Sequence, residues 1–212
     1  MNLKGRFFIG CKVLVLPFVL QFVGGHILLA EDVLPVKASS AAVRSASAEY
    51  TKRVQAHQVP AVKLIDQFGR QMDLRELMSE DRPVMVNFIF TSCPTICPVL
   101  TSSFASVQKS LDSSGAMRPR MISISIDPAF DTPGRLLDYS RRYGATDDWY
   151  FLTGHQEDVL RVLQAFDAYR GEKMNHTPVM FLRGRPGQSW VRLTGYPTVA
   201  ELISEYHESI KP

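Results

Sequence analysis

The chain has 212 residues, of which 45% are hydrophobic and 21% are charged, a size and composition that fit one globular domain with an extension. The net charge of +3 comes wholly from three basic residues near the start, Lys4, Arg6 and Lys12, and the rest of the chain is neutral. A neutral domain lacks the basic surface that nucleic acids require, so composition excludes nucleic-acid binding as the main function.

The first 30 residues form a segment of their own. The basic residues precede an apolar run over residues 13–23, and Ala30 offers a small residue at which cleavage could occur. This pattern is typical of a signal peptide. The alternative is an uncleaved membrane anchor, which Pro17 and the glycines at 24–25 disfavour. We expect an exported, periplasmic protein, either soluble or anchored to the inner membrane by this segment.

Residues 31–58 are rich in Ala, Ser and Val without a clear period, which predicts a linker. A domain over residues 59–212 follows, and it opens with a predicted hairpin whose turn is at residues 66–69. The apolar run 84–90 predicts a strand that is buried on both faces.

The rest of the domain alternates helices and strands. The predicted elements are a helix from Pro98 to Gly115, a strand at 121–126, a helix opened by Asp131-Thr132-Pro133 and closed at Gly144, a helix at 159–166, strands at 179–182 and 190–193, and a last helix opened by a capping box at Thr198–Glu201. This order predicts an α/β fold in which helices flank a central mixed sheet, and it suits a thioredoxin-like fold with an N-terminal hairpin extension.

Cys93 and Cys97 stand between the buried strand 84–90 and the helix that follows it. The third cysteine, Cys11, belongs to the N-terminal segment and is interpreted as a bystander. Two thiols four residues apart can close a disulfide or bind a soft metal ion. A disulfide across so short a loop would stabilise the fold little, which favours a functional role for the pair.

Proline is disfavoured inside a helix, so the helix should begin near Pro98 and place Cys97 at its N-terminus, where the helix dipole favours a thiolate. No further cysteine is available for a four-ligand zinc site or an iron–sulfur cluster. A histidine as the third ligand would give a three-coordinate site, which is most natural for Cu(I).

His176 is the histidine best placed for that role, because it directly precedes a core strand. A lone histidine in a loop is more often a surface residue than a ligand. In a thioredoxin-like fold, however, this loop lies beside the cysteine pair and often carries a cis proline, which makes Pro178 a candidate. His57, His155 and His207 are predicted at the surface. The thioether of Met174 is a weaker candidate ligand than a filler of the core or surface.

Three motifs and the position of His176 resemble the Sco/SenC family over residues 60–210. The motifs are Phe88-x-Phe-Thr-x-Cys-Pro-x-x-Cys-Pro98, Ser125-Ile-Asp-Pro-x-x-Asp-Thr-Pro133 and Trp149-x-Phe-Leu-Thr-Gly154. The resemblance implies a thioredoxin-like fold, an exported and often membrane-anchored location, and Cys93, Cys97 and His176 as copper ligands. It also implies a role in metallation of the copper centre of cytochrome c oxidase, whose copper-centre subunit, or another exported copper client, would be the partner.

Two positions depart from the family pattern, because Thr95 and Asn175 stand where the family commonly has acidic residues. The alternative function is a thiol-disulfide oxidoreductase without obligatory metal, in which Cys93 attacks a client disulfide and Cys97 resolves the mixed disulfide. A peroxidase is a weaker alternative, because no recognisable peroxidase motif precedes Cys93.

Overall fold

The apolar run after Pro83 forms strand β4 (Val84–Ile89), which lies near the middle of an eight-stranded sheet. The structure is a computed structural model, and it describes residues 50–211. Side chains of β4 alternate between two cores, since Val86 and Phe88 pack in one core and Met85 and Ile89 pack in the other. The predicted strand buried on both faces is therefore confirmed, and the cysteine loop departs from its end.

Seven further strands complete the sheet: β1 (Tyr50–Gln55), β2 (Lys63–Asp66), β3 (Gln71–Asp73), β5 (Arg120–Ser125), β6 (Trp149–Thr153), β7 (Val179–Arg183) and β8 (Trp190–Gly195). Their order in space is β1-β8-β7-β4-β5-β6-β2-β3. The pairs β4–β5 and β5–β6 are parallel, and the other neighbouring pairs are antiparallel. The sheet is mixed, as predicted, and β2 and β3 form the predicted hairpin.

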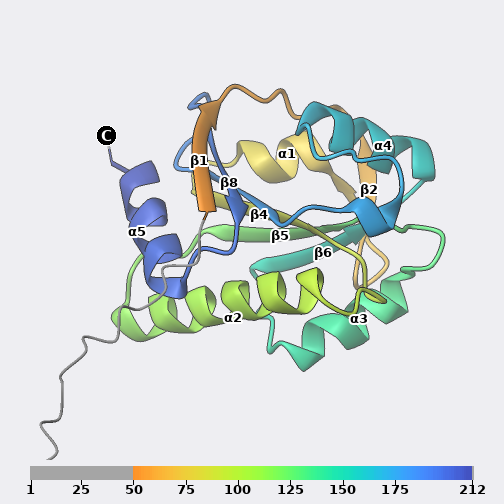
Figure 1. Cartoon of the computed structure of the whole chain (residues 1–212), viewed down its shortest axis with the longest axis horizontal. Coiled ribbons are helices and arrows are strands. Elements are labelled where there is room, and N and C mark those ends of the chain that lie inside the picture. Colours follow the sequence, from red (N-terminus) through yellow and green to blue (C-terminus); the bar gives the residue numbers. More distant parts are fainter. Residues whose placement is uncertain (1–49, 212) are drawn as a thin grey trace, which may run out of the picture. The chain divides into compact units, whose positions relative to one another are not determined.

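Helices cover both faces of the sheet (Figure 1). Helices α1 (Leu74–Ser79) and α4 (Gln156–Ala165) bury Leu77 and Val162 in one core. Helices α2 (Ile96–Ser114), α3 (Pro133–Arg142) and α5 (Val199–Ser209) bury Phe104, Leu136 and Leu202 in the other. A short 3-10 turn, η1 (Lys173–Asn175), precedes β7. The arrangement confirms a central sheet flanked by helices.

Local signals in the sequence set several helix ends. Helix α2 ends at Gly115, whose φ of 66° is the left-handed conformation that glycine adopts readily. Helix α5 begins with the predicted capping box, in which the N–H of Glu201 donates to the Thr198 hydroxyl and the N–H of Thr198 donates to the Glu201 carboxylate. These ends lie where the sequence predicts them.

The predicted linker over residues 31–58 needs a correction. Its last part contains β1, which pairs antiparallel with β8, so the folded domain begins before the predicted Val59. Most side chains of β1 are exposed, and the strand therefore shows no apolar alternation in the sequence. The predicted signal peptide or anchor, residues 1–30, and residues 31–49 lie outside the described residues. Within residues 50–211, no helix combines the length and apolar character needed to span a membrane.

Candidate metal centre

The loop between β4 and α2 presents both cysteines. The N–H of Cys93 donates to the Phe90 carbonyl at 3.1 Å, which closes a tight turn directly after β4. Helix α2 begins at Ile96, two residues before the start predicted near Pro98. Proline is tolerated there because the N–H groups of the first helical turn have no partner within the helix. Cys97 thus lies in the first turn of α2, at the predicted helix N-terminus.

The two sulfur atoms share one cluster of hydrogen bonds. The N–H of Cys97 donates to Cys93 Sγ at 3.5 Å, and the N–H of Phe90 donates to Cys97 Sγ at 3.4 Å. Cys93 keeps 8% of its surface exposed, whereas Cys97 is 0% exposed. Both thiols are free, and they are the only cysteines between residues 50 and 211. Solvent and partners therefore reach the pair through Cys93.

The two thiols differ in acidity. Burial raises the pKa of Cys93, but hydrogen bonds to its sulfur from the backbone N–H groups of residues 95–97 and from the Cys97 thiol outweigh burial. The pKa of Cys93 is therefore lower than that of an ordinary thiol. Burial raises the pKa of Cys97 far above its ordinary value. The Phe90 N–H opposes this shift, and the negative charges of Cys93 and Asp131 add to it.

Asp131 holds the start of the cysteine loop. The N–H and the hydroxyl of Thr91 donate to its carboxylate at 3.1 and 2.5 Å, and the hydroxyl of Ser125 donates to it at 2.6 Å. The sequence predicts Asp131 as part of a helix cap, but the cap of α3 is Thr132. The sequence does contain a signal for this assignment. Proline is common at the first helical position, so Pro133 makes the residue before it, Thr132, the N-cap. Asp131 is then available for another role.

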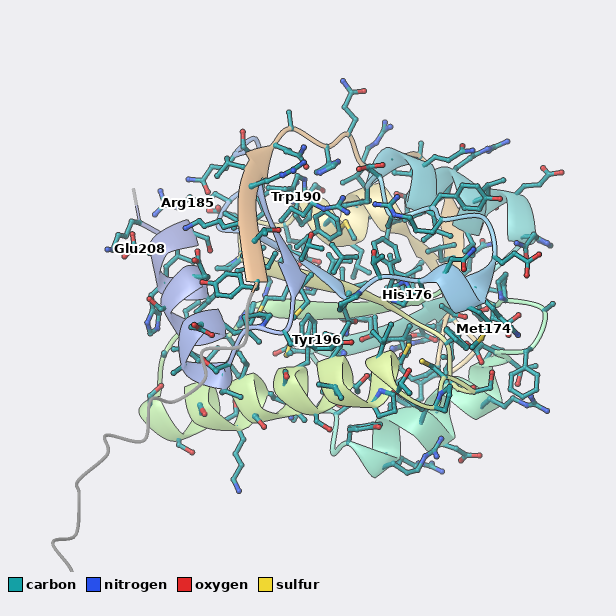
Figure 2. The ribbon with its side chains drawn as sticks, viewed as in Figure 1. Met174, His176, Arg185, Trp190, Tyr196 and Glu208 are labelled. Atoms are coloured by element: carbon teal, nitrogen blue, oxygen red, sulfur yellow. The ribbon has the colours of Figure 1, made fainter. Side chains whose placement is uncertain are left out.

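His176 lies on the connection between α4 and β7 (Figure 2). It is 6% exposed, and its Nε2 atom is buried without a hydrogen-bond partner. It lines a small hollow of about 50 Å³ together with Leu160 and Leu163 of α4. Burial lowers the pKa of His176; a hydrogen bond with the Phe88 backbone opposes the shift, and the Arg170 charge adds to it. The neutral imidazole that this favours is the form that binds metals.

The structure brings Cys93 and Cys97 together, but it does not bring His176 into the same cluster. In the described part of the chain, no three His, Cys, Asp or Glu side chains lie close enough to hold one metal ion. The segment before His176 is held by Lys173, whose Nζ lies 2.5 Å from the Asp127 carboxylate. The three-ligand site therefore stays a prediction.

Two further predictions concern this connection. The peptide bond before Pro178 is trans, so the predicted cis proline is wrong; the sequence permits both isomers and does not choose between them. Met174 is 67% exposed and does not fill the core, and Figure 2 shows it close along the chain to His176. Its thioether is therefore at the surface.

The other histidines are distributed as follows. His155 and His207 are exposed, as predicted. His57 is half-buried, because its ring stacks on Phe166 and meets Phe181 edge-on, with centroid distances of 5.3 Å in both pairs. The prediction of a surface position for His57 is thus wrong. These contacts join segments more than 100 residues apart, and no local pattern indicates them.

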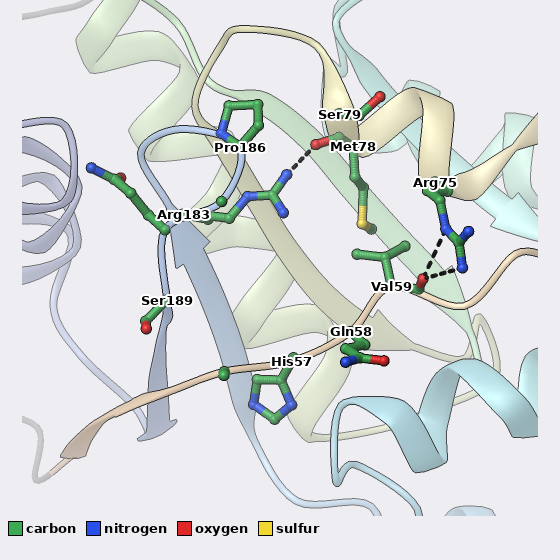
Figure 3. A pocket seen from close by; sticks show the side chains of 12 residues that line it. His57, Gln58, Val59, Arg75, Met78, Ser79, Arg183, Pro186 and Ser189 are labelled. Carbon is green, nitrogen blue, oxygen red and sulfur yellow. Dashed lines mark hydrogen bonds between the residues drawn. The ribbon is translucent and has the colours of Figure 1, made fainter.

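A hollow of about 460 Å³ lies on the α1 side of the molecule, apart from the cysteine loop (Figure 3). Arg183 donates to the Met78 carbonyl, and Arg75 donates to the Val59 carbonyl at 3.3 Å. The residues that line this hollow include no cysteine and no acidic side chain. The two arginines tie neighbouring segments to α1, so the cysteine loop remains the candidate site.

Comparison with known proteins identifies relatives for the whole described domain. The SCO1/SenC family model matches residues 50–211, which is more than half of the chain. The SCO1 protein homolog of Bacillus subtilis is 35% identical over 106 residues, which cover 49% of this chain and 53% of the relative. The mitochondrial SCO1 homolog of Homo sapiens is 30% identical over 115 residues, covering 50% and 38%. The chain thus spans about half or less of the length of these curated relatives.

Solved structures agree with the fold. BsSco, described as a member of the Sco family of cytochrome c oxidase assembly proteins with a disulfide switch, is 27% identical, with a TM-score of 0.63 over 76% of this chain and 97% of that one. ScoI of Arabidopsis thaliana, solved with copper bound, is 25% identical, with a TM-score of 0.60 over 72% and 97%. The predicted thioredoxin-like fold is confirmed. With the family model matching the entire described domain, the chain belongs to the SCO1/SenC family.

Proposed function

We propose that the protein binds copper through the Cys93 and Cys97 thiolates and His176, and that it delivers the metal during assembly of the copper centre of cytochrome c oxidase. The observation that carries this proposal is the pair of free thiols at the start of α2, with backbone N–H groups directed at the Cys93 sulfur. Family membership and a relative solved with copper bound support it.

The donor set fits copper. Two thiolates are soft ligands that suit Cu(I), and the described residues offer no third cysteine for a four-sulfur site. Backbone N–H groups stabilise negative charge on Cys93, so this sulfur is ready to bind a cation. Cys97 must lose its proton when the metal binds, and its high pKa makes binding release a proton and become weaker at low pH.

His176 supplies the third donor in this proposal. Its buried Nε2 atom has no hydrogen-bond partner, and burial favours the neutral ring that can donate an electron pair. A buried polar atom without a partner is costly, so the histidine gains when a metal takes up that atom. Movement of the α4–β7 connection toward the cysteine loop would complete the site.

Family membership and the N-terminal sequence support a proposal for the cellular role. We propose that residues 1–30 direct export as a signal peptide or membrane anchor, and that the domain acts in the periplasm as a metallochaperone. Its client is the copper-centre subunit of cytochrome c oxidase or another exported copper protein. Copper is the cargo, so the site must bind it firmly and still release it by ligand exchange.

A copper titration of the reduced protein tests the proposal. We expect one equivalent of Cu(I) to remain bound against a mild competing chelator, and a Cys93→Ser/Cys97→Ser double variant to bind none. In cells that lack the protein, cytochrome c oxidase activity should return with the wild type but not with the double variant. A wild type that loses its copper to the chelator would contradict the copper role.

A second function, thiol-disulfide exchange, is favoured by the contrast between the two thiols. The Cys93 thiolate would attack a client disulfide, form a mixed disulfide and release one client thiol. Cys97 would then attack the Cys93 sulfur, release the second client thiol and leave the pair oxidised. The more acidic and exposed Cys93 suits the attacking role, and the buried Cys97 suits the resolving role. Reduction of a client by a His176→Ala variant without copper would favour this reading.

A further inference from the structure

The hollow on the α1 side of the molecule is built around a buried arginine (Figure 3). Arg183 of β7 is only 8% exposed, and it forms no ion pair with an acidic side chain among residues 50–211. Its guanidinium lies over the Trp190 ring, with Cζ 4.5 Å from the centroid, and donates to the Met78 carbonyl. The Nε atom is buried without a hydrogen-bond partner, and burial lowers the pKa of Arg183. A buried charge without a counter-ion is costly, so a bound anion would stabilise this arginine.

A second arginine lines the same hollow. Arg75 of α1 is exposed, and its Nε and Nη2 atoms donate to the Val59 carbonyl at 3.3 Å. Figure 3 shows the two arginines on either side of Met78. Because no acidic residue lines the hollow, its wall carries only positive charge. Guanidinium groups pair well with the two oxygen atoms of a carboxylate or with phosphate, so the hollow is suited to an oxyanion.

His57 adds a hydrogen-bond acceptor to the wall of the hollow. Its Nδ1 atom lies 2.9 Å from the Ala165 carbonyl oxygen, which can only accept, so Nδ1 carries the proton of the neutral ring. The other nitrogen, Nε2, is then an acceptor, and it is buried without a hydrogen-bond partner. Figure 3 shows His57 well separated from the Arg183 guanidinium. A ligand that satisfies both groups therefore needs an anionic end and a hydrogen-bond donor some distance from it.

The size and the remaining wall of the hollow favour an organic anion. The volume of about 460 Å³ lies within the usual range for small-molecule sites, about 300–1,000 Å³. Val59, Met78 and Pro186 supply apolar atoms to the wall. An inorganic ion would leave this apolar surface in contact with water, whereas the hydrocarbon part of an organic ligand would cover it.

We infer that this hollow binds a small organic carboxylate that carries a hydroxyl group at a distance from its carboxylate. The carboxylate pairs with Arg183 and Arg75, and the hydroxyl donates to His57 Nε2. The apolar part of the ligand packs against Met78 and its neighbours. This site lies apart from the cysteine loop, so the inference goes beyond the proposed copper function.

The probe for the test is para-hydroxybenzoate, which combines a carboxylate, an apolar ring and a hydroxyl group. It is titrated into the copper-free, full-length protein by isothermal titration calorimetry. We expect saturable binding of one equivalent. Benzoate, which lacks the donor for His57, should bind about fivefold more weakly, and para-hydroxybenzyl alcohol, which lacks the charge, should not bind measurably.

Variants of the lining residues connect this binding to the hollow. Arg183→Gln and Arg75→Gln each remove one charge and should weaken binding of the probe by about tenfold or more. His57→Phe keeps an aromatic ring against Phe166 and should abolish the preference for para-hydroxybenzoate over benzoate. Arg141→Gln is the matched control, because Arg141 is an exposed arginine on α3, which packs in the other core, and its loss should leave the affinity unchanged.

The inference is overturned if the wild type shows no saturable binding of the probe, or if both arginine variants bind it as the wild type does. If Arg183→Gln does not fold, Arg75→Gln decides, since Arg75 is exposed and its replacement leaves the core intact. Inorganic phosphate that displaces the probe at equal concentration would overturn the assignment to an organic carboxylate. The Cys93→Ser/Cys97→Ser variant should bind the probe like the wild type, so this inference and the copper proposal can fail separately.

Discussion

The two halves of the proposed copper site are built in different ways. The cysteine half is fixed by two local features, the turn after β4 and the first turn of α2, and by the buried Asp131, which accepts hydrogen bonds from Thr91, 40 residues away. The histidine half lies on a connection held by the Lys173–Asp127 ion pair, by Lys173 Nζ at 5.7 Å from the Phe90 ring centroid, and by the hydrogen bond of His176 with the Phe88 backbone. A rigid pair of sulfur ligands with a third ligand on a separable segment suits a protein that must release its metal.

The cysteine half should account for most of the copper affinity. Replacement of either Cys93 or Cys97 by Ser removes a soft thiolate that an alcohol cannot replace. Loss of an outer-shell partner of a metal ligand costs about 10- to 100-fold in affinity, so loss of a ligand itself should cost roughly 100-fold or more. Chelator competition with each single variant measures this. An affinity within tenfold of the wild type in either variant would remove that cysteine from the site.

The histidine half should contribute less. We expect His176→Ala to weaken copper binding by less than about 100-fold, and so by less than either cysteine variant, because the two soft thiolates still hold the ion. His155→Ala is the matched control, because His155 is an exposed histidine at the N-cap of α4. If both variants bind like the wild type, the third ligand is another group. A weaker His155→Ala variant would point to a second site.

The contrast between the halves also shows which parts of the molecule the sequence predicts. Strand β4, the Gly115 helix end and the Thr198 capping box depend on neighbouring residues, and all three lie where expected. The cysteine pair at the start of α2 belongs to the same class, because Pro98 limits where the helix can begin. Local patterns thus predict the cysteine half of the site.

Long-range contacts explain what the sequence could not predict. Strand β1 forms only because β8 pairs with it, and its own side chains are mostly exposed. His176 is buried by contacts with distant segments: it hydrogen-bonds with the Phe88 backbone and lines a hollow with Leu160 and Leu163. Asp131 could equally be a cap by residue type, and only its contacts with Thr91 reveal the other role. Each of these features requires the tertiary structure.

The two cysteines should also differ in their reaction with an alkylating agent. Hydrogen bonds lower the pKa of Cys93 and burial raises that of Cys97, so at pH 7 a larger fraction of Cys93 is thiolate. Single Ser variants, which keep a donor group at the replaced position, isolate each thiol. We expect Cys93 to react about tenfold faster or more with iodoacetamide, since one pKa unit is a tenfold change in thiolate.

The pH dependence of the two alkylation rates tests the same difference in pKa. The midpoint of the rise in rate with pH should lie below the ordinary thiol pKa for Cys93, because its pKa is lowered. The midpoint for Cys97 should lie above the ordinary thiol pKa, because burial raises its pKa. A faster reaction at Cys97 than at Cys93 would contradict the assignment of Cys93 as the accessible, acidic thiol.

The smallest expected effect lies at the ion pair that holds the histidine half. Lys173→Met removes the pair with Asp127 and keeps a long side chain over Phe90. In this conformation His176 is not grouped with the cysteines, so loss of the ion pair should favour the movement that completes the site. A partly exposed pair contributes about 0.2–1 kcal/mol, and copper affinity should therefore rise by about fivefold at most.

In the Lys173→Met experiment, the direction of the change in copper affinity is more informative than its size. Lys109→Met, in which an exposed lysine on α2 is replaced, controls for the loss of a positive charge. Lower affinity in Lys173→Met alone would mean that the ion pair persists in the copper-bound form and positions His176 rather than restrains it. Loss of an ion pair that restrains the copper-free form raises the copper affinity, whereas loss of one that persists in the copper-bound form lowers it. The direction of the change in affinity therefore distinguishes a histidine half that must move from one that is already in place.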